Sequence, residues 1–243
     1  MQGILASFDR RRRRVQRDMA PLRWRTCLFV TVNVVLISMM LLDAAVGARD
    51  IAAPVHRLGR MLTDFGESGW IICVSAFLFF EGWAACHLLR SVRYRCQAVQ
   101  ISRIGAYLLV SIALSGLLAN LLKRVIGRAR PQHFEDLGIF GFSPFSNASF
   151  QSFPSGHATT IGAFFAALAL LFPRYRILFL ACALWLGMTR VMVGAHYPSD
   201  VAAGLALGGW FSLMIAIVCA RLGLLFRTGP DGFPLPRRPL SWT

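Results

Sequence analysis

Two histidines and an aspartate are the residues of this sequence best suited to acid, base or nucleophilic chemistry. His196 precedes Asp200 by four residues, whereas His157 has no carboxylate close to it in the sequence. Asp200 can accept a hydrogen bond from one ring nitrogen of His196, which fixes the tautomer and leaves the other nitrogen free to act as a nucleophile. His157 can protonate a leaving oxygen and later activate water. We therefore predict that His196 is the nucleophile and that His157 is the general acid and base.

Three cations and a helix start predict a binding site for phosphate. Lys123, Arg130 and Arg190 carry long cationic side chains, and the arginine fork matches the geometry of phosphate oxygens. Ser155 and Gly156 begin an apolar run, so free helix N–H groups and the positive end of the helix dipole would face the same anion. A side chain on Gly156 would keep the backbone away from the phosphate.

Each of these residues also has a purely structural explanation. A lone histidine in a membrane protein is often an interior hydrogen-bonded residue, and Lys or Arg at a helix end often anchors that end among lipid headgroups. We expect such anchoring for Arg124 and Arg128, and we assign no role to His56, His87 and His133. The coincidence of two histidines, a carboxylate and three cations favours a site over separate structural roles.

The three clusters resemble the signature of the type-2 phosphatidic acid phosphatases, a family that includes vanadium haloperoxidases and bacterial lipid phosphatases. The family pattern is Lys, six residues, Arg-Pro; then Pro-Ser-Gly-His; then Ser-Arg, five residues, His, three residues, Asp. The matching segments here are 123–131, 154–157 and 189–200. Thr189 stands where the family has Ser, which leaves open the packing and hydrogen bonding of that position.

The resemblance implies a metal-independent phosphohistidine mechanism without a cofactor. It also implies a helical core like that of haloperoxidases and acid phosphatases and, in membrane members, a site at the outer leaflet surface. Similar proteins act on phosphatidylglycerol phosphate, phosphatidic acid, undecaprenyl diphosphate or lipid A. The size and compact outer loops suit lipid A 1-phosphate or undecaprenyl diphosphate, and physical argument does not separate the two.

Long apolar runs must position these residues. The chain has 243 residues, of which 56% are hydrophobic and 15% charged, with a mean hydropathy of +0.57, and this excludes an ordinary soluble domain. A helix satisfies its own backbone hydrogen bonds in lipid, so the runs predict an all-α, polytopic membrane protein. The six predicted transmembrane helices cover residues 26–46, 69–89, 104–122, 157–173, 177–195 and 201–220.

The distribution of Lys and Arg predicts the orientation in a bacterial inner membrane. Most of the 26 Lys and Arg fall on the side of the N-terminus, which places both termini in the cytoplasm. Half of the remainder gather in the short stretch 123–130, which indicates a periplasmic site. We divide the chain into a basic cytoplasmic segment 1–25, a six-helix phosphatase domain 26–226 and a flexible, Pro-rich cytoplasmic tail 227–243. A cleaved signal in residues 1–48 is a weaker alternative, because its apolar run is long and contains Asp43.

Several alternatives stay open. The net charge of +15 is interpreted as a topology signal rather than as a sign of nucleic acid, so the expected partners are a phosphorylated lipid substrate and membrane lipids. A lipid-to-lipid phosphotransferase would use the same residues, and a transporter or binding protein would hold the anionic lipid without cleaving it. The segment 50–67 is either an interfacial helix that covers the site or a plain connector. The oligomeric state is left open.

Overall fold

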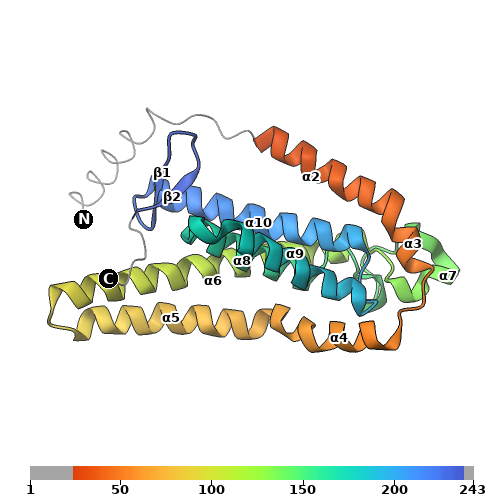
Figure 1. Cartoon of the computed structure of the whole chain (residues 1–243), viewed down its shortest axis with the longest axis horizontal. Helices are drawn as coiled ribbons and strands as arrows, with labels where there is room; N and C mark the ends of the chain where they lie inside the picture. The colour runs from red at the N-terminus through yellow and green to blue at the C-terminus, as the bar shows by residue number, and fades with distance from the viewer. Residues whose placement is uncertain (1–23, 238–243) are drawn as a thin grey trace.

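The computed structural model of the chain describes residues 24–237 and is a bundle of long helices (Figure 1). This confirms the predicted all-α membrane fold, with a short β-hairpin added at one end. The principal elements are α2 (Trp24–Ser38), α3 (Ala44–Gly47), α4 (Ala53–Thr63), α5 (Ser68–Leu88), α6 (Val92–Ile126), α7 (Phe134–Leu137), α8 (Gly156–Leu171), α9 (Arg176–Met192), α10 (Pro198–Arg221), β1 (Phe226–Thr228) and β2 (Pro234–Pro236).

Each predicted apolar run corresponds to a helix, although the runs 69–89, 157–173 and 177–195 extend one to three residues beyond α5, α8 and α9. The count of six spans is not confirmed. Among the described residues, five helical stretches are long and apolar enough to cross a membrane, and α8 is a shorter apolar helix. The predicted run 104–122 is also shorter than the helix that contains it, because α6 has 35 residues and begins at Val92. Its first turns carry several arginines, so a hydropathy pattern detects only the part of the helix that lies in hydrocarbon.

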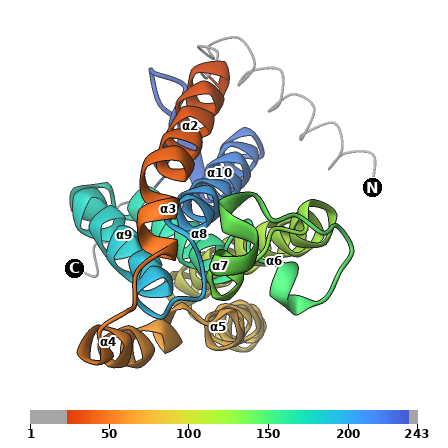
Figure 2. The same ribbon diagram turned by 90° about the vertical axis from the view of Figure 1, so that its right-hand side faces the viewer.

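The short helix α8 lies in the middle of the bundle, surrounded by α6, α9 and α10 (Figure 2). It runs parallel to α10 with close backbone contact: a Cβ on Gly204 would lie 2.5 Å from the carbonyl oxygen of Ser155, and the Ser212 hydroxyl donates to the Ala163 carbonyl at 2.6 Å. Small residues at such spacing let membrane helices approach closely. The parallel packing brings the first turns of α8 and α10 together at one end.

The hairpin of α5 and α6 completes that end. The two helices are antiparallel and in contact where Gly82 faces Ser102 and Gly105 faces Phe79. Because α6 runs opposite to α10, it finishes where α8 and α10 begin (Figure 1). The carboxyl end of α6 and the amino ends of α8 and α10 therefore surround one region.

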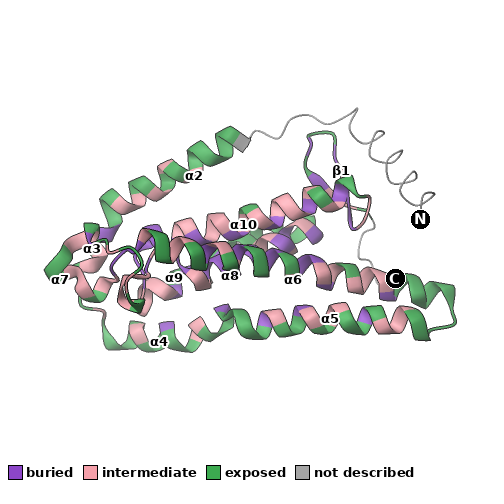
Figure 3. Cartoon of the chain, turned by 180° about the vertical axis from the view of Figure 1, so that it is seen from behind, coloured by how far each residue is buried: buried purple, intermediate pink, exposed green. Residues whose placement is uncertain are grey.

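The first helix is attached mainly through its last turns. Most of α2 diverges from the bundle and is exposed (Figure 3). A π-helical turn, Met39–Asp43, follows it and ends in Asp43, whose side chain is fully buried. Such π-turns interrupt α-helices frequently at functional sites, and this one carries the acidic group of the predicted first span into the protein interior.

The predicted flexible tail differs from the structure over its described part. β1 and β2 pair antiparallel, and Phe226 is fully buried against Tyr107, with ring centroids 5.1 Å apart. The apolar pair Leu225 and Phe226 closes the core cluster between α6, α8 and α10, which holds the chain down beyond the last helix. Residues 1–23, which make up most of the predicted N-terminal segment, and 238–243 lie outside the described residues.

Candidate active site

The predicted site residues lie at the end of the bundle where α6 finishes and α8 and α10 begin. Lys123 is in the last turn of α6 and Arg190 in the last turn of α9. His157 lies in the first turn of α8 and Asp200 in the first turn of α10. Residues far apart in the sequence thus meet because the helices alternate in direction.

A sharp chain reversal after α6 positions Arg130. Gly127 ends the helix with φ 62°, and its N–H donates to the Lys123 carbonyl at 3.0 Å. A Cβ on Gly127 would overlap the Ser143 backbone, so only glycine fits this left-handed position. The extended stretch that follows is held by neighbouring loop backbone, including a bond from the Arg130 N–H to the Ser149 carbonyl at 2.9 Å.

Three cationic side chains converge with donors available for an anion. An ideal Cβ on Gly156 would lie 3.1 Å from the Lys123 Nζ, so the ammonium faces the start of α8. The Nε atoms of Arg130 and Arg190 are buried and have no hydrogen-bond partner within the described residues. Leaving a buried donor unsatisfied costs about 1–3 kcal/mol, and an anionic ligand would supply the missing acceptors.

The segment 50–67 contributes to the site rather than only connecting two spans. It contains α4, which packs on α9 with Gly59 against Met192. Thr63 at the end of α4 accepts a hydrogen bond from the Nη1 of Arg190 at 2.7 Å. The contact fixes one end of the guanidinium, whose Nε has no hydrogen-bond partner within the described residues.

The two histidines face the same group of cations. His157 lies within electrostatic range of His196 and of Lys123, Arg130 and Arg190. His196 in turn lies within range of Lys123 and Arg190. The two imidazoles are therefore on the same side of the membrane, as the predicted chemistry requires.

A backbone carbonyl holds the imidazole of His196. Its Nδ1 lies 2.9 Å from the Ser152 carbonyl oxygen and 3.7 Å from Asp200 Oδ2. A carbonyl oxygen only accepts, so Nδ1 carries the proton and Nε2 of the neutral ring keeps a free lone pair. The expected direct hydrogen bond to Asp200 is thus replaced by one to Ser152, whose position in a loop gives no sequence signal.

Burial sets the protonation state of His196. The side chain is 2% exposed, and burial lowers the pKa of His196, while Asp200 acts in the opposite direction. The desolvated ring therefore resists protonation, because the charged form loses more hydration than the neutral form. At neutral pH the imidazole is unprotonated and nucleophilic at Nε2.

Asp200 positions the loop that carries Ser152. Its Oδ2 accepts from the Ser152 hydroxyl at 2.5 Å and from the Tyr197 N–H at 3.0 Å, and its Oδ1 accepts from the Arg128 Nη1 at 2.6 Å. The carboxylate thus caps α10 and ties that helix to the loop. Asp200 therefore reaches His196 both through Ser152 and directly, with its Oδ2 3.7 Å from Nδ1.

Arg128 is a buried part of this network, so its expected role as a headgroup anchor is wrong. The side chain is 1% exposed and lies over the Tyr197 ring at 4.4 Å. Besides Asp200, it binds Asp43 from the first span, at 2.8 Å from Nη2 to Oδ2. Arg124, by contrast, is exposed. Arg128 was missed because lipid anchoring explains a basic residue beside an apolar run as readily as a buried contact does.

The amide donors at the start of α8 differ from the prediction at one position. The N–H of Ser155 donates to the Asp200 carbonyl at 3.0 Å, and its hydroxyl accepts from the Ala158 N–H. The Ser155 amide is therefore not free to bind an anion. Its hydrogen bond joins the start of α8 to α10, and its hydroxyl caps α8. By helix geometry, the next amides, those of Gly156 and His157, have no intrahelical acceptor and remain suitable for an anion.

Thr189, at the position where the family pattern has Ser, does not point its hydroxyl at the cations. Its side chain is fully buried, and the hydroxyl donates to the Leu186 carbonyl in its own helix at 2.6 Å. The hydroxyl that Ser and Thr share is thus used inside α9. The substitution leaves the set of charged site residues unchanged.

Substitution of Gly156 by Ala should lower activity without unfolding the protein. The new methyl group would lie 3.1 Å from the Lys123 Nζ, and a flexible lysine can move away at little cost in stability. Because the ammonium would leave the helix start, we expect a fall of about tenfold in kcat/KM, which corresponds to about 1.4 kcal/mol. Phosphate release and thermal unfolding measured on the same preparation test this. A Gly209→Ala variant serves as the control, because a Cβ there meets only Ala166 at 3.7 Å.

Comparison with known proteins shows similarity in both sequence and fold. Residues 104–223, which include every predicted site residue, match the PAP2 superfamily. The chain is similar to a lipid A 1-phosphatase of Rhizobium johnstonii, at 62% identity over 98% of both chains. It is also similar to a lipid A 1-phosphatase of Rhizobium etli, at 65% identity over 90% of this chain and 95% of that one. The first transmembrane PAP2 type phosphatidylglycerolphosphate phosphatase from Bacillus subtilis shares the fold, with a TM-score of 0.52, 20% identity and coverage of 79% of this chain and 91% of that one.

Proposed function

The chain belongs to the PAP2 superfamily, and from that premise we propose that this membrane lipid phosphatase hydrolyses the 1-phosphate of lipid A. One observation carries the choice of substrate. The similarity to two lipid A 1-phosphatases extends over 98% and 90% of the chain, so it includes the loops around the site and the first helices as well as the motifs. Substrate choice resides in such surrounding segments rather than in the residues that handle the phosphate.

The proposed reaction proceeds through a phosphohistidine. Nε2 of His196 attacks phosphorus while the bond from phosphorus to the lipid oxygen breaks, and His157 gives its proton to that oxygen. His157 then takes a proton from water as the water oxygen attacks phosphorus. The N–P bond breaks, inorganic phosphate leaves and both histidines return to their starting states. The Ser152 carbonyl holds His196 at Nδ1 throughout, at 2.9 Å in the resting site.

The cations supply the stabilisation of charge. Lys123, Arg130 and Arg190 would surround the equatorial oxygens, where negative charge spreads in the transition state. The unpartnered Nε atoms of both arginines support this assignment. The amides of Gly156 and His157 add the positive end of the α8 dipole.

We further propose that the site faces the periplasm and that both termini are cytoplasmic. The support is the charge distribution, because most Lys and Arg lie toward the opposite side from the site. The exposed Phe140, Phe142 and Phe145 of the site loops suit an interface that a lipid substrate must approach.

Phosphate release from a panel of lipids tests the proposal. The protein is purified in detergent, incubated with excess EDTA and given lipid A 1-phosphate, undecaprenyl diphosphate, phosphatidic acid or phosphatidylglycerol phosphate. We expect inorganic phosphate from lipid A 1-phosphate in the absence of any acceptor lipid, and a kcat/KM at least tenfold above that for the other lipids. Release that requires an acceptor would identify a phosphotransferase instead. Loss of activity in EDTA would contradict a mechanism in which cationic side chains alone stabilise the charge.

A further inference from the structure

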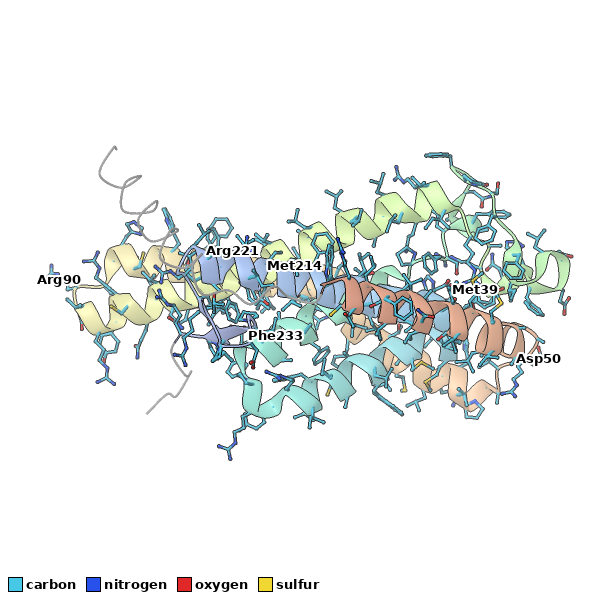
Figure 4. The ribbon with its side chains drawn as sticks, turned by 90° about the horizontal axis from the view of Figure 1, so that it is seen from above. Met39, Asp50, Arg90, Met214, Arg221 and Phe233 are labelled. Carbon is cyan, nitrogen blue, oxygen red and sulfur yellow. The ribbon has the colours of Figure 1, made fainter. Side chains whose placement is uncertain are left out.

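A second basic site lies at the end of the bundle opposite the candidate active site. A pocket of about 570 Å³ opens between the first turns of α6 and the chain that follows α10. Its α6 wall consists of residues 92, 95, 96, 99, 100 and 103, whose spacing of three and four places them on one helix face. Leu224 and Arg237, on either side of the β-hairpin, form the other wall. Arg90 and Asp50 mark these two opposite ends of the molecule (Figure 4).

Three arginines give the described lining of this pocket a positive charge. Arg95, Arg103 and Arg237 line it, and no carboxylate lies among its described lining residues. Arg95 donates from Nε to the Cys86 carbonyl at 3.1 Å, and Arg237 donates from Nη1 to the Gly223 carbonyl. These bonds fix the guanidinium groups without neutralising them. Each fork keeps further N–H donors for an anion.

The position along α6 places the pocket at the depth of lipid headgroups. Arg103 precedes Lys123 by 20 residues on one continuous helix, so the two are about 30 Å apart along its axis, at a rise of 1.5 Å per residue. This matches the hydrocarbon thickness of a bilayer, about 30 Å. With Lys123 at one boundary, Arg103 reaches the other, and Arg95 lies about 12 Å further out, among headgroups.

The chemistry of the lining identifies the class of ligand. Arginine forks bind phosphate oxygens in pairs, whereas Val92, Val99 and Leu224 offer apolar surface in the same pocket. Basic pockets between membrane helices suit phospholipid headgroups. We propose that this pocket binds the phosphodiester of an anionic phospholipid in the leaflet opposite the active site. The bound lipid would bridge α6 to the β-hairpin and hold the two together.

Lipid titration of the full-length protein tests this. Delipidated protein in neutral detergent is titrated with dioleoylphosphatidylglycerol, with dioleoylphosphatidylcholine or with inorganic phosphate, and binding is followed by native mass spectrometry and thermal unfolding. We expect phosphatidylglycerol to bind and raise Tm by linkage, and phosphatidylcholine to do neither. The Arg95→Gln, Arg103→Gln double variant should weaken phosphatidylglycerol binding at least tenfold. The Arg237→Gln variant, which alters the opposite wall, should weaken it in the same direction.

The matched control is Arg93→Gln, because Arg93 is exposed on the same helix but does not line the pocket. It should retain wild-type binding. Equal losses in the control and the double variant, or full binding in the double variant, would overturn the proposal. Inorganic phosphate binding as tightly as the lipid would overturn the assignment to a phospholipid. The readout is binding at a remote site, so it is independent of which lipid the enzyme hydrolyses.

Discussion

Replacing His196 with Ala should abolish phosphate release. We expect kcat to fall about 10⁴-fold or more, which is the usual effect of removing an enzyme nucleophile. In the proposed reaction, the imidazole forms the first new bond to phosphorus and water forms the second. Its Nε2 is free because the Ser152 carbonyl, 2.9 Å from Nδ1, fixes the tautomer. No other described residue of the site combines a buried neutral nitrogen with such a partner.

Trapping the intermediate separates the roles of the two histidines. After a rapid quench, wild-type enzyme given ³²P-labelled lipid should carry acid-labile, protein-bound phosphate, and the His196→Ala variant should carry none. The His157→Ala variant should still become labelled from p-nitrophenyl phosphate, whose leaving group needs no proton. The label should then persist, because water activation is lost as well. Labelling of the His196→Ala variant would exclude this residue as the nucleophile.

The control for both variants is Arg124→Gln, which removes a cation that is exposed and outside the site. It should change kcat less than threefold. A loss equal to that of His196→Ala would mean that the stretch 123–130 acts through its total charge, and the assignment of separate roles would be wrong.

The site was predictable where the chemistry depends on short spacings. His196 lies four residues before Asp200, just outside the first turn of α10, and the segment 154–157 leads into α8. Their proximity to each other or to helix amides therefore follows from short sequence separation. The convergence of distant segments followed from alternating helix direction, which hydropathy indicates. Residue types and spacings therefore carried most of the candidate site.

The supporting contacts were not predictable, because they join segments with no common pattern. Asp43 accepts hydrogen bonds from the N–H and hydroxyl of Ser199, 156 positions away, and nothing in a 20-residue apolar run indicates where its acidic residue points. No sequence pattern indicates the contacts of Ser152 either. The β-hairpin after α10 was missed because proline-rich sequence resembles a tail, whereas the burial of Phe226 depends on the tertiary fold.

The largest effect on the fold is expected from Arg128. Its guanidinium joins Asp43 of the first span to Asp200 of the last helix, at 2.8 and 2.6 Å, with all three side chains at most 1% exposed. Ser199 completes the cluster by donating its hydroxyl to Asp43 at 2.5 Å. One cation thus compensates two buried carboxylates. Since α2 otherwise diverges from the bundle (Figure 1), this cluster is a principal attachment of the first span.

Arg128→Met should destabilise the protein by about 3–5 kcal/mol, because it removes one partner and leaves uncompensated buried charge. Arg128→Lys should rescue little, since a single ammonium cannot span both carboxylates as the planar fork does. Activity should fall through kcat rather than KM. Asp200 would no longer position Ser152 and hence His196, whereas the phosphate-binding cations would stay in place. Unfolding in detergent and steady-state kinetics measure the two effects.

A double-mutant cycle distinguishes a specific network from general loss of packing. In the Arg128→Met, Asp43→Asn variant, one of the two stranded carboxylates is neutral, so the double variant should lose less stability than the sum of the single losses, by at least about 1 kcal/mol. Arg124→Met, which removes an exposed cation from the same stretch, should leave stability within about 0.5 kcal/mol of wild type. Additive losses at Arg128 and Asp43 would mean that their charges are not coupled. In that case other contacts would have to attach α2, although most of its side chains are exposed.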